Sequence, residues 1–289
     1  MPQSEEAVPR SYRLASIATL ILTVTVTVVG LFVPEFYRDA PSLLPQVYGQ
    51  DIITLVVAVP AFAIALYYAS RGSLRGYTVW LGVAGYLLYT YASYAFMTAF
   101  NELYLVYIVL LWLTLVIFVG GMARLDASAL KQAVGEQSVR PYIAFHVLLG
   151  VLITFLCGAE ILPATLAGTT PPSIAEAGLP TSVIYSLNLG ILVPAFFLTA
   201  YWLREGEPWG YAFTAVLLVK VATLGGAVLS MAVFMIRGGE PVPFPQIIIF
   251  GFLTLTSIFL MSRFLRSIQP EPRETPVQMA TSTESQGGR

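Results

Sequence analysis

Eight long apolar stretches constrain this chain more than any other feature of its sequence. A helix of about 20 residues crosses the hydrocarbon core of a bilayer, and each stretch is long enough to do so. Backbone polar groups cannot face lipid unbonded, and the period-two alternation of a membrane barrel is absent, so we expect helices. The sequence therefore predicts an all-α, polytopic membrane bundle of eight transmembrane helices. We place them at residues 12–33, 51–70, 76–100, 103–123, 141–163, 182–203, 209–236 and 246–266.

The composition fits a membrane protein and excludes two other classes. Hydrophobic residues make up 57% of the 289 residues and charged residues 11%, whereas an ordinary soluble domain is about 25% charged. This excludes a soluble enzyme, and a chain with so few charges lacks the clustered basic surface that binds nucleic acid. The expected partner is the lipid bilayer of the cell membrane, with a small-molecule or lipid ligand as a candidate. The sequence leaves the oligomeric state open.

The basic residues predict the orientation of the spans. Cytoplasmic segments are enriched in Lys and Arg. With the N-terminus in the cytoplasm, the outer segments hold only Arg38 and Arg237, and both termini are cytoplasmic. The inner segments then hold Arg10, Arg13, Arg71, Arg75, Arg124, Lys131, Arg140, Arg204, Arg263, Arg266, Arg273 and Arg289.

The spans divide the chain into two halves. Residues 12–124 form the first four-helix membrane repeat and 141–266 the second. Between them, the cytoplasmic linker 125–140 has the pattern of a short amphipathic helix. Residues 1–11 form a cytoplasmic tail, and 267–289, rich in Pro, Glu, Ser, Thr and Gln, form a disordered cytoplasmic tail.

An internal repeat supports this division. Val59-Pro60-Ala61-Phe62 recurs as Val193-Pro194-Ala195-Phe196, and the same offset maps Gly76-Tyr77 onto Gly210-Tyr211. Because four helices are an even number, two such halves run in the same direction through the membrane. Pro60 and Pro194 lie inside their helices, where a proline removes a backbone hydrogen bond and kinks the helix. The two kinks serve either packing or a hinge.

Lys220 is the most informative single residue. It lies about 15 Å into the seventh span, too deep for its stem to reach either interface easily. It is therefore neutral, paired with another group, or facing a wet cavity. Either it is a structural lysine satisfied by helix carbonyls and hydroxyls, or it has a functional role.

Several polar residues could share the space around Lys220. The predicted ligand-binding set combines it with residues of the third, fifth and sixth spans: Glu160, Asn188, Tyr86, Thr90 and Tyr94. Tyr86, Thr90 and Tyr94 follow at i, i+4 and i+8, so they form one stripe on a helix. At the outer ends of the spans, Asp51, Asn101 and Glu102 are either helix caps or the lining of an outer vestibule.

The chemistry of a cofactor is restricted by two counts. Cys157 is the single cysteine and His146 the single histidine, so no cluster of cysteines or histidines can hold a metal. A lysine in a late span is similar to that of the retinal-binding rhodopsins. However, the middle of the third span carries no carboxylate, and Val216 stands one turn before Lys220. We therefore expect no cofactor and no metal.

The segment VPAFFLTAYWLREGEPWGYAFTAVLLVKVATLGG, residues 193–226, resembles a segment of uncharacterised prokaryotic multi-pass membrane proteins. The Pro-Trp-Gly-Tyr turn and the intramembrane lysine carry this resemblance. It covers the sixth and seventh spans and implies no activity.

Three hypotheses about function follow from these observations. The first is a protein that binds or transports a small or amphipathic ligand through an outward-facing cavity centred on Lys220. The second is a structural or assembly subunit of a membrane complex, in which no cavity exists. The third is a membrane-embedded enzyme, which the sequence favours less because it offers no recognisable catalytic constellation.

Overall fold

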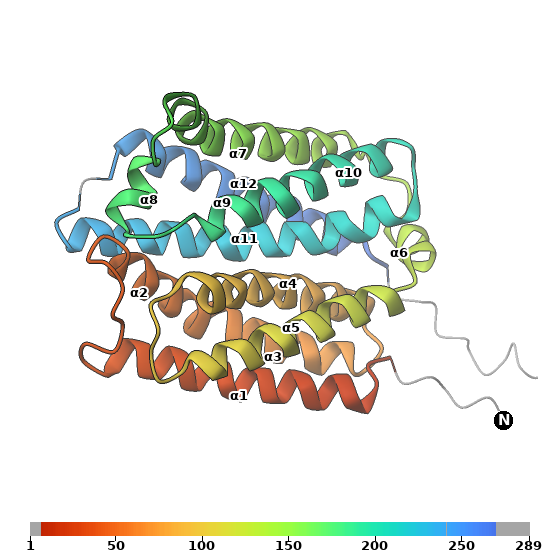
Figure 1. Cartoon of the computed structure of the whole chain (residues 1–289). Coiled ribbons are helices and arrows are strands. Elements are labelled where there is room, and N and C mark those ends of the chain that lie inside the picture. Colours follow the sequence, from red (N-terminus) through yellow and green to blue (C-terminus); the bar gives the residue numbers. More distant parts are fainter. Residues whose placement is uncertain (1–6, 241, 270–289) are drawn as a thin grey trace, which may run out of the picture.

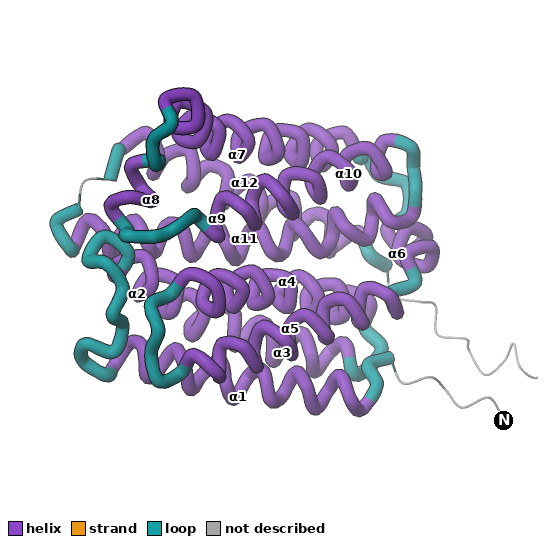
Figure 2. The backbone as a smooth tube through the Cα atoms, viewed as in Figure 1, coloured by secondary structure: helices purple, strands orange, loops and turns teal. Residues whose placement is uncertain are grey.

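Long helices running roughly along one common axis make up the protein, which we describe from a computed structural model covering residues 7–240 and 242–269 (Figure 1). Loops gather at the two ends of the bundle, and within the described residues no strand is present (Figure 2). The helices form two groups, one from each half of the chain, which meet along α4 and α11.

The first half contains one broken and three continuous long helices. They are α1 (Arg10–Phe32), the broken helix of α2 (Leu44–Ile53), a π-helical segment η1 (Thr54–Ala58) and α3 (Val59–Ala69), then α4 (Leu74–Met97) and α5 (Tyr104–Arg124). The second half has the same sequence of parts. They are α7 (Arg140–Ala167), the broken helix of α9 (Val183–Leu187), η2 (Asn188–Leu192) and α10 (Val193–Arg204), then α11 (Pro208–Arg237) and α12 (Phe244–Ser267).

Seven of these long helices are apolar enough to cross a membrane, which makes the chain a multi-pass membrane protein. The prediction from sequence had eight, and the one that falls outside the seven is α4, expected at 76–100. The physical reason is its content of Tyr, Gly, Thr and Ser, which lowers its hydropathy. Most of α4 is buried by neighbouring helices, so its polar groups meet protein instead of lipid.

Both predicted proline kinks take the form of a π-helical segment. The N–H of Val59 bonds to the carbonyl of Thr54, and the N–H of Val193 bonds to that of Asn188, five residues back in each case. A proline lacks the N–H that would continue the ordinary ladder, and its ring crowds the carbonyl of residue i−4. Widening the preceding turn relieves that crowding, so Pro60 and Pro194 each lie two residues after the end of a π segment.

Glycines let the two halves approach closely. A Cβ on Gly82 of α4 would lie 2.4 Å from Cβ of Val219 on α11. A Cβ on Gly49 of α2 would lie 2.5 Å from the backbone N and Cα of Met231, also on α11. Helix α11 therefore packs against both α4 and α2, and these contacts form the seam between the halves.

A short helix closes one end of the bundle. Helix α6 (Ala127–Val134) begins at Asp126, whose side chain accepts a hydrogen bond from the N–H of Ala129, and it buries Ala127, Leu130 and Val134. The described chain ends at the same place, where the N–H of Gln269 donates to the carbonyl of Ala133. Figure 1 shows the N-terminal end of α1 and helix α6 at this end, which we call the α6 end. Most of the disordered tail predicted at 267–289 lies outside the described residues.

Candidate functional site

A cavity of about 420 Å³ lies between the two halves. Its walls come from α2 and α4 of the first half and from α7, α9, η2, α11 and α12 of the second. At one end it reaches the loops opposite the α6 end, through Asp39, Thr98 and Val242. Both its size and its position between packed helices are typical of small-molecule sites.

Most of the cavity wall is apolar, and a few polar groups interrupt it. Aliphatic and methionine side chains dominate, among them Leu192, Leu224, Val228, Met231 and Met235. The polar lining residues are Asp39, Gln46, Gln50, Tyr89, Thr90, Ser93, Tyr94, Thr98, Asn188 and Gln246. An amphipathic molecule would match such a wall, with its apolar body along the aliphatic residues and its head at the polar ones.

One group of buried hydrogen bonds joins α2 to α4 beside the cavity. The amide of Gln50 donates to the hydroxyl of Tyr86 at 3.0 Å and to that of Thr90 at 2.7 Å. Thr54, the first residue of η1, lies 2.9 Å from the Tyr86 hydroxyl. Of these residues Gln50 and Thr90 line the cavity, and Tyr86 stands behind them. The network holds the start of the first π segment against α4.

Lys220 lies at the seam between the halves and behind the cavity wall. Its side chain is 5% exposed, and its Nζ has no hydrogen-bond partner among the described residues. The Nζ lies 4.3 Å from the centre of the Tyr89 ring, a cation–π geometry. Tyr89 itself lines the cavity, so one aromatic ring separates Lys220 from it.

Tyr89 connects Lys220 to the part of the cavity wall that comes from the second half of the chain. Its hydroxyl donates to Oδ1 of Asn188 at 3.0 Å, and Nδ2 of Asn188 lies 4.0 Å from Sγ of Cys157. Asn188 is the first residue of η2, so the second π segment is also held against α4. Asn188 and Cys157 both line the cavity, and of the two only Asn188 belongs to the set predicted around Lys220.

Asp51 is buried, although the sequence indicated a position at the outer end of a span. It is 1% exposed and accepts from the hydroxyl of Tyr37 at 2.5 Å and from that of Tyr94 at 2.8 Å. Tyr94 lines the cavity and Asp51 does not. The helix that carries Asp51 begins at Leu44, well before the predicted start at 51, which moves the carboxylate inwards.

The remaining predicted residues lie apart from the cavity. Glu160 accepts from the backbone N–H of Ser173 and from the hydroxyl of Tyr185, near the short helix α8 (Pro172–Glu176). Asn101 is buried in the loop between α4 and α5, where its side chain accepts from the N–H of Leu103.

Glu102 follows Asn101 and forms an exposed ion pair with Arg38. Its own backbone N–H and then Arg38 hydrogen-bond to the carboxylate, and together they hold the pKa of Glu102 below its usual value. Two of the predicted vestibule residues, Asn101 and Glu102, therefore stabilise loops at the end of the bundle opposite the α6 end.

Asp39 is the one charged residue among the described residues that line the cavity, and it lies at the loop end. Its Oδ1 accepts from the N–H of Ala99, while its Oδ2 is buried without a partner. Burial raises the pKa of Asp39, and the hydrogen bond from Ala99 opposes that rise.

This raised pKa makes stability depend on pH at Asp39. The folded chain keeps this proton at pH values where the unfolded chain, with an aspartate pKa of about 3.9, has lost it. The parent should gain stability relative to Asp39→Asn as the pH falls through the folded pKa, and lose that gain as the pH rises. The measurement is the difference in apparent unfolding temperature between the two proteins in detergent across a pH series. A difference that is constant with pH, or that slopes the other way, would contradict the assignment.

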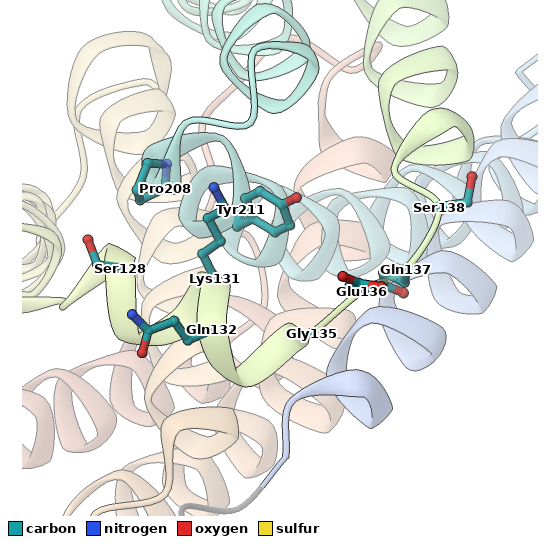
Figure 3. Close-up of a pocket in the computed structure, with 9 residues that line it drawn as sticks. All are labelled: Ser128, Lys131, Gln132, Gly135, Glu136, Gln137, Ser138, Pro208 and Tyr211. Carbon is teal, nitrogen blue, oxygen red and sulfur yellow. The ribbon is translucent and has the colours of Figure 1, made fainter.

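A second hollow, of about 790 Å³, lies at the α6 end (Figure 3). Its walls are α6, the loop after it and the start of α11, and Ser128, Gln132 and Glu136 are exposed there. Lys131 already donates to the carbonyl of Gly206 at 2.7 Å. This hollow is a surface depression, and we place the candidate site in the cavity between the halves.

Several residues of the site were not predicted from the sequence, and three of them matter most for its hydrogen bonds and contacts. Gln50 lies outside the expected span, Tyr89 lies off the stripe of Tyr86, Thr90 and Tyr94, and Cys157 was considered only as the single cysteine of the chain. The true start of α2 would have placed Gln50 beside Asp51 inside a helix. Nothing in one sequence pairs Tyr89 with Lys220, because that contact joins the two halves.

Within the described residues, no group of three or more His, Cys, Asp or Glu side chains could hold a metal ion. Comparison with protein families, with curated proteins and with solved structures finds no match for this chain. The proposed function therefore rests on the geometry of the cavity.

Proposed function

We propose that this membrane protein binds, and moves across the bilayer, a small amphipathic molecule that occupies the cavity between its two halves. The observation that carries the proposal is the cavity itself: about 420 Å³, largely apolar, with hydrogen-bonding side chains from both halves converging on it. A purely structural subunit would have no reason to keep this space open, because filling it with apolar side chains would stabilise the chain.

The charge of the lining favours a ligand with an uncharged head. None of the described lining residues is a lysine, arginine or histidine, and Lys220 is separated from the cavity by the ring of Tyr89. The one acidic lining residue, Asp39, lies at the loop end, where burial raises its pKa and favours its neutral form. Gln50, Thr90, Ser93 and Asn188 offer neutral donors and acceptors instead. The expected head is a hydroxyl, amide or ester, because burying an unpaired charge here would be costly.

Correspondences between the two halves of the chain support a ligand site at the interface between them. Each π segment precedes the motif Val-Pro-Ala-Phe, at Thr54–Ala58 and Asn188–Leu192. Gly72 and Gly206, also related by the repeat, both adopt a positive φ, of 81° and 72°. These correspondences support an origin by duplication, with α4 and α11 as counterparts packed at the centre.

The glycines that follow support the same relationship. A Cβ on Gly76 would meet Tyr68 and Ala69, and one on Gly210 would meet Trp202 and Leu203, which are the counterparts of that pair. Paired hinges on either side of a central cavity suit a protein that opens it to one side of the membrane and then to the other.

The basic residues support the α6 end as the cytoplasmic one, with both termini there and the cavity reaching the opposite, outer side. A cysteine introduced at position 175, on the α8 side, should react with an impermeant thiol reagent in intact cells. One introduced at position 132 on α6 should react only after the cells are opened. Cys157 is first replaced by serine in both variants.

The native Cys157 is a built-in reporter of the cavity. It is the only cysteine of the chain, it lines the cavity, and it is 4% exposed. We expect N-ethylmaleimide to label Cys157 in membranes, and decanol to slow the labelling several-fold by occupying the cavity. Decanoate and decyltrimethylammonium have the same chain with charged heads, and they should protect less.

Two variants place the effect in the cavity. Ala232→Phe fills it and should slow labelling and abolish protection by decanol. Ala159→Phe adds the same side chain to an exposed face of α7, two residues from Cys157, and should change neither. Labelling that decanol and Ala232→Phe both leave unchanged would overturn the proposed function.

A further inference from the structure

We propose that Asp51 is a proton-binding site coupled to the cavity, so that the ligand and a proton influence each other's binding. This inference rests on the proposed function. Asp51 is the most buried carboxylate of the bundle core described above, and its two oxygens accept from different tyrosines, Tyr37 and Tyr94.

The surroundings of Asp51 contain hydroxyls and no cation. In the part of the chain that the structure describes, its carboxylate contacts are the two tyrosine hydroxyls, with no ion pair. The titratable groups that face it from the loop, α4 and α5 are all tyrosines, namely Tyr37, Tyr86, Tyr91, Tyr94 and Tyr107. A carboxylate this deeply buried without a counter-charge binds a proton readily, because the charged form loses its hydration.

The basic residues on the packed helices are placed elsewhere. On α11, the Nζ of Lys220 lies over Tyr89, and Arg237 is exposed at the last position of the helix. On α1, Arg10 and Arg13 begin the helix, roughly 25 to 30 Å along it from Gly30, the residue whose Cβ would touch Asp51.

The arginines of α4 and α5 are equally remote from Asp51. Arg75 donates to the carbonyl of Ile268 at the α6 end, and Arg124 is the last residue of α5, just before α6.

The hydrogen bond from Tyr94 links the proton to the cavity. When a proton from water binds Oδ1 of Asp51, the new O–H can donate to the Tyr94 hydroxyl oxygen, and Tyr94 then directs its own hydrogen to another acceptor. The carbonyl of Val47 lies 3.5 Å from the Tyr94 hydroxyl and is the alternative acceptor. Tyr94 and Val47 both line the cavity, so gain or loss of the proton rearranges the wall.

Asp51 is also close to the first hinge. It lies three residues before η1, and its neighbour Gln50 bonds to Tyr86 and Thr90 on α4. Movement of Tyr94 and of the helical turn that carries Asp51 therefore acts on η1, the segment where the helix is widened. Coupling of this kind is reciprocal: a ligand that favours one wall arrangement also favours one protonation state.

The first test observes the proton directly on the unmodified protein. The chain has only three aspartates, Asp39, Asp51 and Asp126, so carbon-13 labelling of aspartate gives three carboxyl signals by infrared spectroscopy in lipid. Asp39→Asn and Asp51→Asn assign them. We expect the Asp51 signal to change from carboxylic acid to carboxylate across an accessible pH range, with no dependence on sodium concentration at constant pH. A signal that stays ionised throughout, or that follows sodium, would overturn the proposal.

The second test observes the coupling. The rate of N-ethylmaleimide labelling of Cys157 is measured in the parent and in Asp51→Asn in the same buffer, so that the intrinsic pH dependence of the thiol cancels in the ratio. The ratio of the parent rate to the Asp51→Asn rate should be near one in acid, where both side chains are neutral. In alkali it should differ from one by a factor of about five or more. A ratio independent of pH would overturn the coupling while leaving the decanol protection, and with it the proposed function, intact.

Discussion

Lys220→Met is expected to raise the stability of the folded protein by about 1–3 kcal/mol. The Nζ of Lys220 is buried without a hydrogen-bond partner among the described residues, so folding removes its hydration and returns only the contact with the Tyr89 ring. That cation–π contact offsets about 0.5–2 kcal/mol. Methionine keeps the length of the side chain, fills the same space and has nothing to desolvate.

The apparent unfolding temperature in detergent measures this effect. Leu217→Met, a buried position one turn earlier on α11, is the matched control, because it introduces the same side chain without removing a charge. That control should cost less than about 1.5 kcal/mol. A marked loss of stability in Lys220→Met alone would mean that the ammonium has a partner which outweighs its burial.

Gly49→Ala is expected to destabilise the bundle by about 1–3 kcal/mol or more, since a single methyl group overpacks the seam between the halves. The added Cβ would lie 2.5 Å from the backbone N and Cα of Met231, and backbone atoms of a packed helix cannot turn aside as a flexible side chain can. Helix α2 and helix α11 would have to separate. That movement would also widen the cavity wall at Met231.

Gly251→Ala, the same type of substitution, is expected to have the opposite effect on stability. Gly251 lies inside α12, and a Cβ there would have no atom within 4 Å. Alanine should stabilise this helix by about 0.5–1 kcal/mol, because glycine loses more backbone freedom on folding. The two variants are compared by thermal unfolding in the same detergent. Equal effects of the two variants would show that α2 and α11 do not approach as closely as described.

The sequence predicted the helices well because spans and prolines act locally. Apolar runs indicate the spans, and Pro60 and Pro194 indicate the two interruptions, although only the structure shows that these are π segments. The sequence did not predict that α4 would be the buried, more polar helix, because its partners come from both halves. Apolar length alone could not separate a helix facing lipid from one facing protein.

The site was predicted less completely because its contacts are between distant segments. The depth of Lys220 indicated that it would be buried, and Asn188, Thr90 and Tyr94 do line the cavity. The contact of Lys220 with Tyr89 and the pair of tyrosines on Asp51 depend on helix rotation and register. Neither follows from spacing within one helix, so one sequence could not assign them.

Native mass spectrometry of the purified protein tests the central claim most directly, namely that the cavity between the halves holds an amphipathic molecule. The parent and the control Ala159→Phe should retain a small non-protein mass after the detergent is stripped, or take up decanol when it is added. Ala232→Phe should do neither, although thermal unfolding should show that it is folded to the same extent as the parent. Equal binding by all three proteins, or by none, would contradict the account.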